Sequence, residues 1–285
     1  QAECSDLSKE TWSIQRMSEV FEQFQVECEA MLLFLKSVKR VEFWQKEDTL
    51  SLGFRATLSE NACTMRQRLR DMLSMATKSI RSAVEEYKSV LRCTEVAEVC
   101  LETCGNKDRK EWLLSSYVDD TEALCFSEEK SAEVSGSRFI PWMLMALPLT
   151  GSCDGNLFCF LQLPIKTGAS FHLNGFFELS SNRRDLWDGP DLVGPEAIKR
   201  DWNNLLFSTV APACFLNALE CLTCMRQKNK NVTCANTWWQ QAFPPQLKDF
   251  EKHVFQQAMV SAAPAVVETA AGPRKMIDCL WIDKR

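Results

Sequence analysis

Hydrophobic residues form one continuous stripe along residues 11–36, at alternating steps of three and four. The stripe consists of Ile14, Met17, Phe21, Phe24, Cys28, Met31 and Leu35. This spacing is typical of an amphipathic helix with one buried face. A strand is predicted to follow at residues 38–44, because Val41 and Phe43 alternate there with charged residues.

A second helical pattern covers residues 60–92 and predicts one long helix or two helices joined near Thr77. Strand character follows at residues 95–103 and 110–118, separated by a polar turn at 105–108. Residues 119–136 are acidic and polar, and they predict a helix of uncertain length with an exposed loop. A further buried strand is expected at residues 139–147. The apolar positions of residues 60–92 are Met65, Leu69, Met72, Met75, Ile80, Val84, Tyr87 and Leu91.

Residues 155–187 contain the strongest β pattern of the chain. Two apolar runs, 157–163 and 170–179, flank the turn-forming residues 164–168, so a β-hairpin is predicted. Gly175 interrupts the second run, which suggests a bulge or a close backbone approach. The polar cluster Ser180-Ser181-Asn182 then predicts a helix cap, with Arg183 and Arg184 opening a short helix.

The C-terminal third is helical up to a change in composition. Residues 196–210 and 213–225 predict helices, with Pro212 bending or restarting the helix between them. Composition shifts at Asn229, so we predict one domain over residues 1–228 and the start of a following unit over residues 229–285. That second unit is expected to contain a helix at 247–259 and a strand at 276–282. Together these elements predict an α/β (α+β) sandwich with a mixed sheet, long packing helices and a small C-terminal helical extension.

The net charge and the hydropathy of the chain bear on two classes of partner, nucleic acid and membrane. The 285 residues carry a formal net charge of −5 and no long basic run, which makes nucleic acid an unlikely partner class. The longest apolar run, residues 139–149, is too short to span a bilayer and contains Pro141 and Pro148. The chain begins at Gln1 rather than methionine, so we expect it to be cut from a longer protein.

The chain has fourteen cysteines, but their spacing suggests no disulfide framework. Many lie within apolar patterns, so we interpret them as reduced, largely buried thiols of a cytoplasmic protein. Cys221 and Cys224, with Cys234 nearby, resemble part of a zinc site. No fourth ligand lies at a suitable spacing, so no metal is expected.

Arg183 and Arg184 are the candidate functional residues. At the N-terminus of a helix each would be disfavoured by about 0.3–1 kcal/mol unless an anion compensates. Asp185 and Asp188 are one possible compensation, through local ion pairs. The other is a phosphate, which the planar guanidinium binds in a bidentate manner. The spacing alone does not choose between these two interpretations.

A resemblance to a known family rests on four motifs. They are F-L-x-L-P-I-x-T-G at residues 160–168, H-x-N-G-x-F at 172–177, S-N-R-R-D-L-W at 181–187 and D-W-N-x-L-L-x-x-x-V-A-P-A at 201–213. The chain thereby resembles the repeat region of the sacsin family, large intracellular co-chaperones. The resemblance implies the segment that follows an ATPase domain like that of the ninety-kilodalton heat-shock chaperones, and therefore a fold similar to the middle domain of those chaperones.

The resemblance also implies roles for particular residues. Arg183 or Arg184 would act as a catalytic residue toward the γ-phosphate of ATP, which the upstream domain holds with magnesium. No cofactor is expected in this segment, because it has no glycine-rich phosphate loop. Client proteins or other chaperones are the implied partners. The corner would be shaped by Ser181, Asn182, Asp185 and Trp187.

The principal alternative is a non-catalytic scaffold that binds client or cytoskeletal proteins, with the arginines tied to Asp185 and Asp188. A self-sufficient hydrolase is the weakest alternative. Neither His172 nor His253 has a serine or cysteine arrangement that indicates nucleophilic catalysis.

Overall fold

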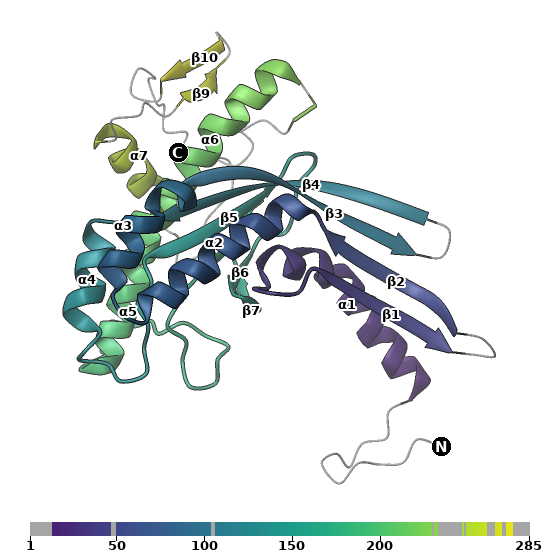
Figure 1. The fold of residues 1–285 in the computed structure, drawn as a ribbon, viewed down its shortest axis with the longest axis horizontal. Coiled ribbons are helices and arrows are strands. Elements are labelled where there is room, and N and C mark those ends of the chain that lie inside the picture. The colour runs from purple at the N-terminus through teal and green to yellow at the C-terminus, as the bar shows by residue number, and fades with distance from the viewer. Residues whose placement is uncertain are drawn as a thin grey trace.

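The structure is a computed structural model that describes residues 13–46, 50–103, 106–229, 231–232, 247, 249–260, 266–269 and 272–275. Its strands and helices are arranged as a mixed α/β fold (Figure 1). The helices are α1 (Ile14–Phe34), α2 (Glu60–Ala76), α3 (Ile80–Leu91), α4 (Glu122–Lys130), α5 (Pro195–Leu205), the π-helical turn η1 (Leu206–Val210), α6 (Ala211–Lys228) and α7 (Phe250–Val260).

The centre of the fold is an eight-stranded sheet in the order β1-β2-β3-β4-β5-β8-β6-β7. Neighbouring strands are antiparallel except β6 and β8, which run parallel, so the sheet is mixed. The predicted mixed α/β class is therefore confirmed. The strands are β1 (Arg40–Lys46), β2 (Leu50–Leu58), β3 (Cys93–Thr103), β4 (Asn106–Val118), β5 (Trp142–Pro148), β6 (Asn156–Cys159), β7 (Leu161–Lys166) and β8 (His172–Gly175).

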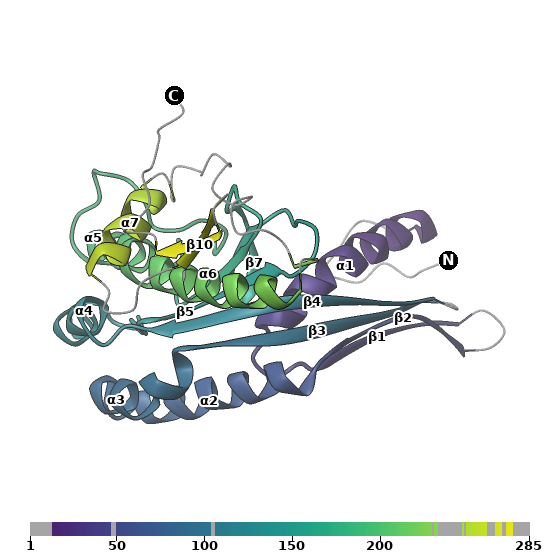
Figure 2. The same ribbon diagram turned by 90° about the horizontal axis from the view of Figure 1, so that it is seen from above.

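Helices cover both faces of this sheet. Strand β5 is buried along its whole length, because its side chains alternate between two hydrophobic clusters. Trp142 and Leu144 belong to the cluster formed with α1, α2 and α3, whereas Met143 and Met145 belong to the cluster formed with α5, η1, α6 and α7. Figure 2 shows α2 and α3 on one side of the sheet and α6 and α7 on the other.

The predicted helices and strands of the N-terminal half are confirmed, with small shifts at their ends. The pattern over residues 60–92 forms two helices rather than one, and Ser79 caps the second by accepting a hydrogen bond from the Ser82 N–H (3.2 Å). In α1 the C-terminal half is buried at Cys28, while Met17 near its start is 44% exposed. The predicted stripe is thus covered only along part of its length.

The structure contains a hairpin in this region, but the prediction that residues 164–168 form its turn was wrong. Its two strands, β6 and β7, turn at Phe160, so the chain reverses inside the first apolar run and β7 continues into the residues predicted as the turn. Phe160 has φ +62°, a left-handed conformation that is rare for an aromatic residue and that local sequence does not indicate. Pro164 lies inside β7 instead of in a turn, which is tolerated because β7 is the edge strand. The second run supplies β8, which pairs with β5 and β6.

The C-terminal helices α5, η1 and α6 form one continuous helical segment from residue 195 to residue 228. A proline cannot donate the usual backbone hydrogen bond, and its ring collides with the carbonyl four residues earlier. The wider π turn directly before Pro212 accommodates this defect, as predicted for a restart of the helix at that point.

Beyond residue 228, the described residues include α7 and a two-stranded ribbon of β9 (Val266–Thr269) and β10 (Gly272–Lys275). Phe250 of α7 packs on Phe171 and Phe215, with ring centroids 5.9 and 5.5 Å apart. The predicted strand at residues 276–282 lies outside the described residues. The predicted boundary at Asn229 stays a prediction.

Candidate functional site

The two candidate arginines lie in a short loop that follows β8, which we call the arginine corner (residues 180–185). Its ends are held together by an antiparallel bridge between Leu179 and Leu186. Inside this bridge the Ser180 N–H donates to the Asp185 carbonyl (2.8 Å), and the Arg183 N–H donates to the Ser180 carbonyl (2.8 Å). The corner is therefore a closed, hydrogen-bonded loop.

Asn182 is the internal support of the corner. Its Oδ1 accepts from the Ser180 hydroxyl (2.7 Å) and from the Arg184 N–H (2.8 Å). Its Nδ2 donates to the Asp185 carboxylate (2.9 Å). Ser181 is exposed at the same loop. Asn182 and Asp185 thus fix the backbone at the two arginines.

The expected short helix is absent from this described segment, and the prediction was wrong at that point. The polar cluster closes a loop with its own side chains, as asparagine and serine commonly do outside helices. The argument from the helix dipole therefore does not apply. Arg183 has instead φ +57°, a left-handed conformation that costs a non-glycine residue about 1–2 kcal/mol.

Both arginine side chains are exposed, and within the described chain neither lies within 4.0 Å of a carboxylate. The Asp185 carboxylate accepts from Asn182, and the Asp188 carboxylate accepts from the Gly189 N–H (2.8 Å). The local acids are thus engaged elsewhere, and both guanidinium groups are accessible to an external anion.

The corner is anchored from behind by Asn203 of α5, which the sequence analysis did not single out. Asn203 is 2% exposed. Its Oδ1 accepts from the Glu178 N–H (2.9 Å), and its Nδ2 donates to the carbonyls of Glu178 (2.9 Å) and Trp187 (3.2 Å). The sequence signal for this residue was its place in the D-W-N motif, beside Trp202.

We expect Asn203→Ala to lower the free energy of unfolding by about 2 kcal/mol, because buried backbone groups on both sides of the corner lose their partner. Urea denaturation of the variant measures this effect. Asn204→Ala is the matched control, since Asn204 is the exposed neighbour on the same helix. Equal stability of the two variants would contradict an anchoring role for Asn203.

Four buried or half-buried thiols are poor candidates for nucleophiles. Burial raises the pKa of Cys159, and the charges of Lys36 and Arg183 oppose this effect. Burial also raises the pKa of Cys28 and Cys93 to about 11 and that of Cys153 to about 12. Since the thiolate is the reactive form, these groups are inert near neutral pH.

A cleft of about 580 Å³ lies on the other side of the corner. Trp187 and Asp188 line it together with Asn203 and His253, but neither arginine does. The described residues contain no cluster of three or more histidine, cysteine, aspartate or glutamate side chains suited to a metal ion. Cys221 is half-buried and Cys224 is exposed on α6, and Cys234 lies outside the described residues.

One described helical segment, Pro195–Lys228, is long and apolar enough to cross a membrane by length and composition alone. In the folded chain, 67% of its most apolar window is buried inside the protein. The core helix of a soluble protein has the same properties, so this segment is weak evidence for a membrane span.

Comparison with known proteins confirms the resemblance derived from the motifs. The chain is 29% identical to human sacsin over 232 residues, which cover 74% of this chain and 5% of sacsin. It therefore spans a small fraction of that protein's length. No family model matches the chain. No solved structure matches it either, so the similarity to the middle domain of the heat-shock chaperones stays a prediction.

Proposed function

Because the chain is sacsin-like, we propose that it is a non-autonomous segment of an intracellular molecular (co-)chaperone. In this proposal the segment supports an ATPase domain that precedes it in the same chain, and it contributes to the folding or assembly of client proteins in the cytoplasm. ATP and magnesium are held by the upstream domain. The similarity to a segment of human sacsin supports this assignment.

The observation that carries the proposal is the state of the arginine corner. Its two guanidinium groups are exposed and have no carboxylate partner among the described residues, and the loop that carries them is fixed by Asn182 and anchored by Asn203. A left-handed backbone at Arg183 adds local strain, and strain of this kind concentrates at functional sites. Such a preorganised cation suits the stabilisation of charge that develops during phosphoryl transfer.

The fold is compatible with the proposed middle-domain role. A mixed sheet with helices on both faces carries the corner in the loop that follows β8, and β8 itself is buried. The proposed likeness to the middle domain of the ninety-kilodalton heat-shock chaperones rests on this arrangement and on the sequence motifs. In that role the corner would couple the nucleotide state of the upstream domain to closure of the two domains.

Exposed apolar side chains on α1 and β1 suit contact with a neighbouring protein or domain. Met17 is 44% exposed, Val20 is 36% exposed and Trp44 of β1 is 45% exposed. Apolar groups that gather on a surface commonly mark contacts with other proteins. An upstream domain is a partner that would cover these side chains. A scaffold that binds clients without catalysis would use the same surface, so catalysis has to be tested at the arginines.

In a protein that includes the upstream ATPase domain, we expect Arg183→Ala or Arg184→Ala to lower kcat for ATP about tenfold, equivalent to about 1.4 kcal/mol of barrier. Apparent affinity for ATP should change far less, because the arginine would meet the γ-phosphate mainly in the transition state. Steady-state ATPase assays over a range of ATP concentrations measure both quantities.

Arg200→Ala is a control, because Arg200 pairs with Asp201 (2.7 Å) and donates to the Gly189 carbonyl (3.0 Å) instead of facing solvent freely. Thermal melting of each variant checks that the corner remains folded. If both corner variants fold as the parent does and hydrolyse ATP at the parental rate, the corner is architecture and the scaffold function is favoured.

A further inference from the structure

A cationic cavity lies away from the arginine corner, where the turn between α1 and β1 meets α2. It has a volume of about 220 Å³. It continues into a narrow apolar slot of about 20 Å³, and the two share Lys36, Arg66 and Arg70. We call the cavity and the slot together the cationic pocket. The cavity is lined by Lys36, Ser37, Lys39, Cys63, Arg66 and Arg70.

Arg66 is the unusual member of the pocket. It is only 8% exposed, and its Nη1 donates to the Val38 carbonyl (2.7 Å). Its Nε and Nη2 are buried, and neither has a hydrogen-bond partner among the described residues. Burial, with the nearby charge of Arg70, lowers the pKa of Arg66 to about 10, so the group is still charged at neutral pH. A buried charge with unpaired donors is costly unless a ligand satisfies it.

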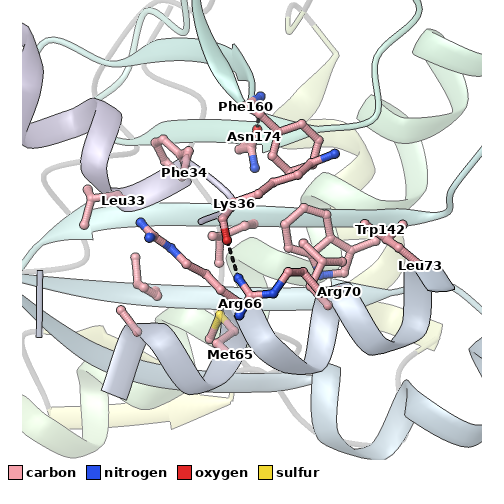
Figure 3. A pocket seen from close by; sticks show the side chains of 14 residues that line it. Leu33, Phe34, Lys36, Met65, Arg66, Arg70, Leu73, Trp142, Phe160 and Asn174 are labelled. Carbon is pink, nitrogen blue, oxygen red and sulfur yellow. Dashed lines mark hydrogen bonds between the residues drawn. The ribbon is translucent and has the colours of Figure 1, made fainter. Parts of the chain in front are cut away.

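Asn174 supplies a second unpaired donor to the slot. It is 1% exposed, and its Oδ1 accepts from the N–H of Phe160 (2.8 Å). Its Nδ2 is buried, and the part of the chain that the structure describes offers it no hydrogen-bond partner. Lys36 lies between Asn174 and the two arginines, and its Nζ is 3.9 Å from the centre of the Phe160 ring (Figure 3). The slot therefore has hydrogen-bond donors but no carboxylate among its lining residues.

Within the described ranges, Lys36, Arg66 and Arg70 have no carboxylate within 4.0 Å. Arg70 donates to the Lys36 carbonyl, shown as a dashed line in Figure 3, and to the side-chain oxygen of Gln67. Both of these acceptors are neutral. Lys39 lies 3.7 Å from the carboxylate of Glu60, whose side chain is 88% exposed. Lys36, Arg66 and Arg70 therefore place their positive charges in the lining of the same cavity.

We propose that the cationic pocket binds a phosphate group, held by the charges of Arg66 and Arg70, whose side chains line the cavity together with Lys36 and Lys39. A phosphate monoester carries about −1.5 to −2 charges at pH 7, which matches this cluster better than a single carboxylate does. Its oxygens suit the fork of an arginine. A cavity of about 220 Å³ is smaller than most ligand pockets, so the phosphate is the anchored part of the ligand.

The test is thermal unfolding of the 285-residue chain in increasing inorganic phosphate, with sodium chloride added to keep the ionic strength constant. A ligand that binds only the folded state raises the melting temperature with its concentration. We expect a rise of about 2 °C or more in 50 mM phosphate, on the scale typical of a domain of this size. Acetate at the same concentration should have no such effect. An equal rise with acetate, or no rise with phosphate, would overturn the proposal.

Substitutions locate the effect. Arg66→Met should abolish the phosphate-dependent rise, yet in phosphate-free buffer the variant should melt no lower than the parent, because it removes a buried charge with unpaired donors. Arg70→Gln should also reduce the rise. Lys78→Gln makes the same change in net charge at the exposed end of α2 and should retain the full rise. A full rise in Arg66→Met would show that phosphate acts elsewhere.

A comparison of O-phosphoserine with inorganic phosphate shows whether the pocket binds a phosphorylated protein segment or the free ion. If O-phosphoserine raises the melting temperature more than inorganic phosphate at equal concentration, the pocket takes a phosphorylated protein segment. If inorganic phosphate is the stronger ligand, the pocket takes the free ion. Either preference supports the proposal only when Arg66→Met removes it. The test does not involve ATP turnover, so its outcome is independent of the function proposed for the arginine corner.

Discussion

Gly155→Ala is expected to reduce the free energy of unfolding by about 4 kcal/mol or more, which places it among the most damaging single substitutions. A Cβ atom at this position would lie 2.0 Å from the Thr167 Oγ1, 2.1 Å from the Phe171 carbonyl oxygen and 2.3 Å from the Ala169 carbonyl oxygen. Two of these three atoms belong to the backbone. No side-chain rotation relieves such overlaps, so the loop itself would have to move.

That loop is held tightly against Gly155. The Thr167 N–H donates to the Gly155 carbonyl (2.9 Å), and the buried Thr167 hydroxyl lies 2.9 Å from the Phe171 carbonyl and 3.0 Å from the Ala169 carbonyl. Phe171, directly before β8, is fully buried in the core. Displacing the loop would therefore break these hydrogen bonds and disturb the packing around β8.

Urea denaturation of the purified chain, or loss of soluble protein on expression, measures this effect. Gly151→Ala is the matched control, because Gly151 has φ +73° but nothing lies within 4 Å of its added Cβ. The control should lose only about 1–2 kcal/mol, the cost of a left-handed conformation for alanine. Gly155→Ala within 1 kcal/mol of the parent would contradict the close approach.

The sequence was sufficient for elements whose signal is local. The spacing of apolar residues located α1 and its following strand, and it resolved α2 and α3 into a pattern with a possible joint at Thr77. Each of these elements buries one face, so its apolar residues recur in the sequence at the period of a helix or of a strand. The mixed α/β class followed from their order.

The sequence was insufficient where distant contacts decide the backbone. The turn at Phe160 depends on Asn174, fourteen residues away, whose side chain accepts the Phe160 N–H. The parallel pairing of β6 with β8 likewise has no local signal. Local rules therefore placed the turn at the proline and glycine of residues 164–168, which are the usual turn formers.

The candidate site shows the same division. Sequence motifs drew attention to Arg183 and Arg184, but local rules predicted a helix where Asn182 closes a loop. The anchoring role of Asn203 was missed because its partners are main-chain groups of residues 178 and 187. Every residue has such groups, so the residue types at these positions do not indicate the contact. Arg66 lies within a helical pattern whose spacing does not indicate that an arginine is buried, and only the fold shows its burial.

The second large effect concerns pH and is centred on His172. Burial lowers the pKa of this imidazole to about 4, with the charges of Lys110 and Lys166 lowering it further and Asp154 opposing them. Its Nδ1 accepts a hydrogen bond from the Asn156 N–H (3.0 Å), which requires the unprotonated nitrogen. The folded state therefore holds His172 neutral at pH values where an unfolded chain would protonate it.

We expect the chain to lose stability as the pH falls below about 6.5, the ordinary pKa of histidine. Between that value and the folded pKa of about 4, the unfolded state binds more protons, so the free energy of unfolding decreases with decreasing pH. Full stability is present above pH 6.5. The loss reaches about 2 kcal/mol at pH 5 and about 3 kcal/mol below pH 4.

Urea denaturation at pH 7.5 and pH 5.0 measures this difference for the parent and for His172→Gln, which has no titrating group at the site. Carboxylates such as Glu95, whose pKa burial raises, contribute to both proteins and cancel in the comparison. His253, the second histidine of the chain, is present in both proteins as well. The parent should therefore lose about 2 kcal/mol more than His172→Gln on going to pH 5.0. An equal loss in the two proteins would contradict this prediction. It would show that protonation of His172 does not lower the free energy of unfolding.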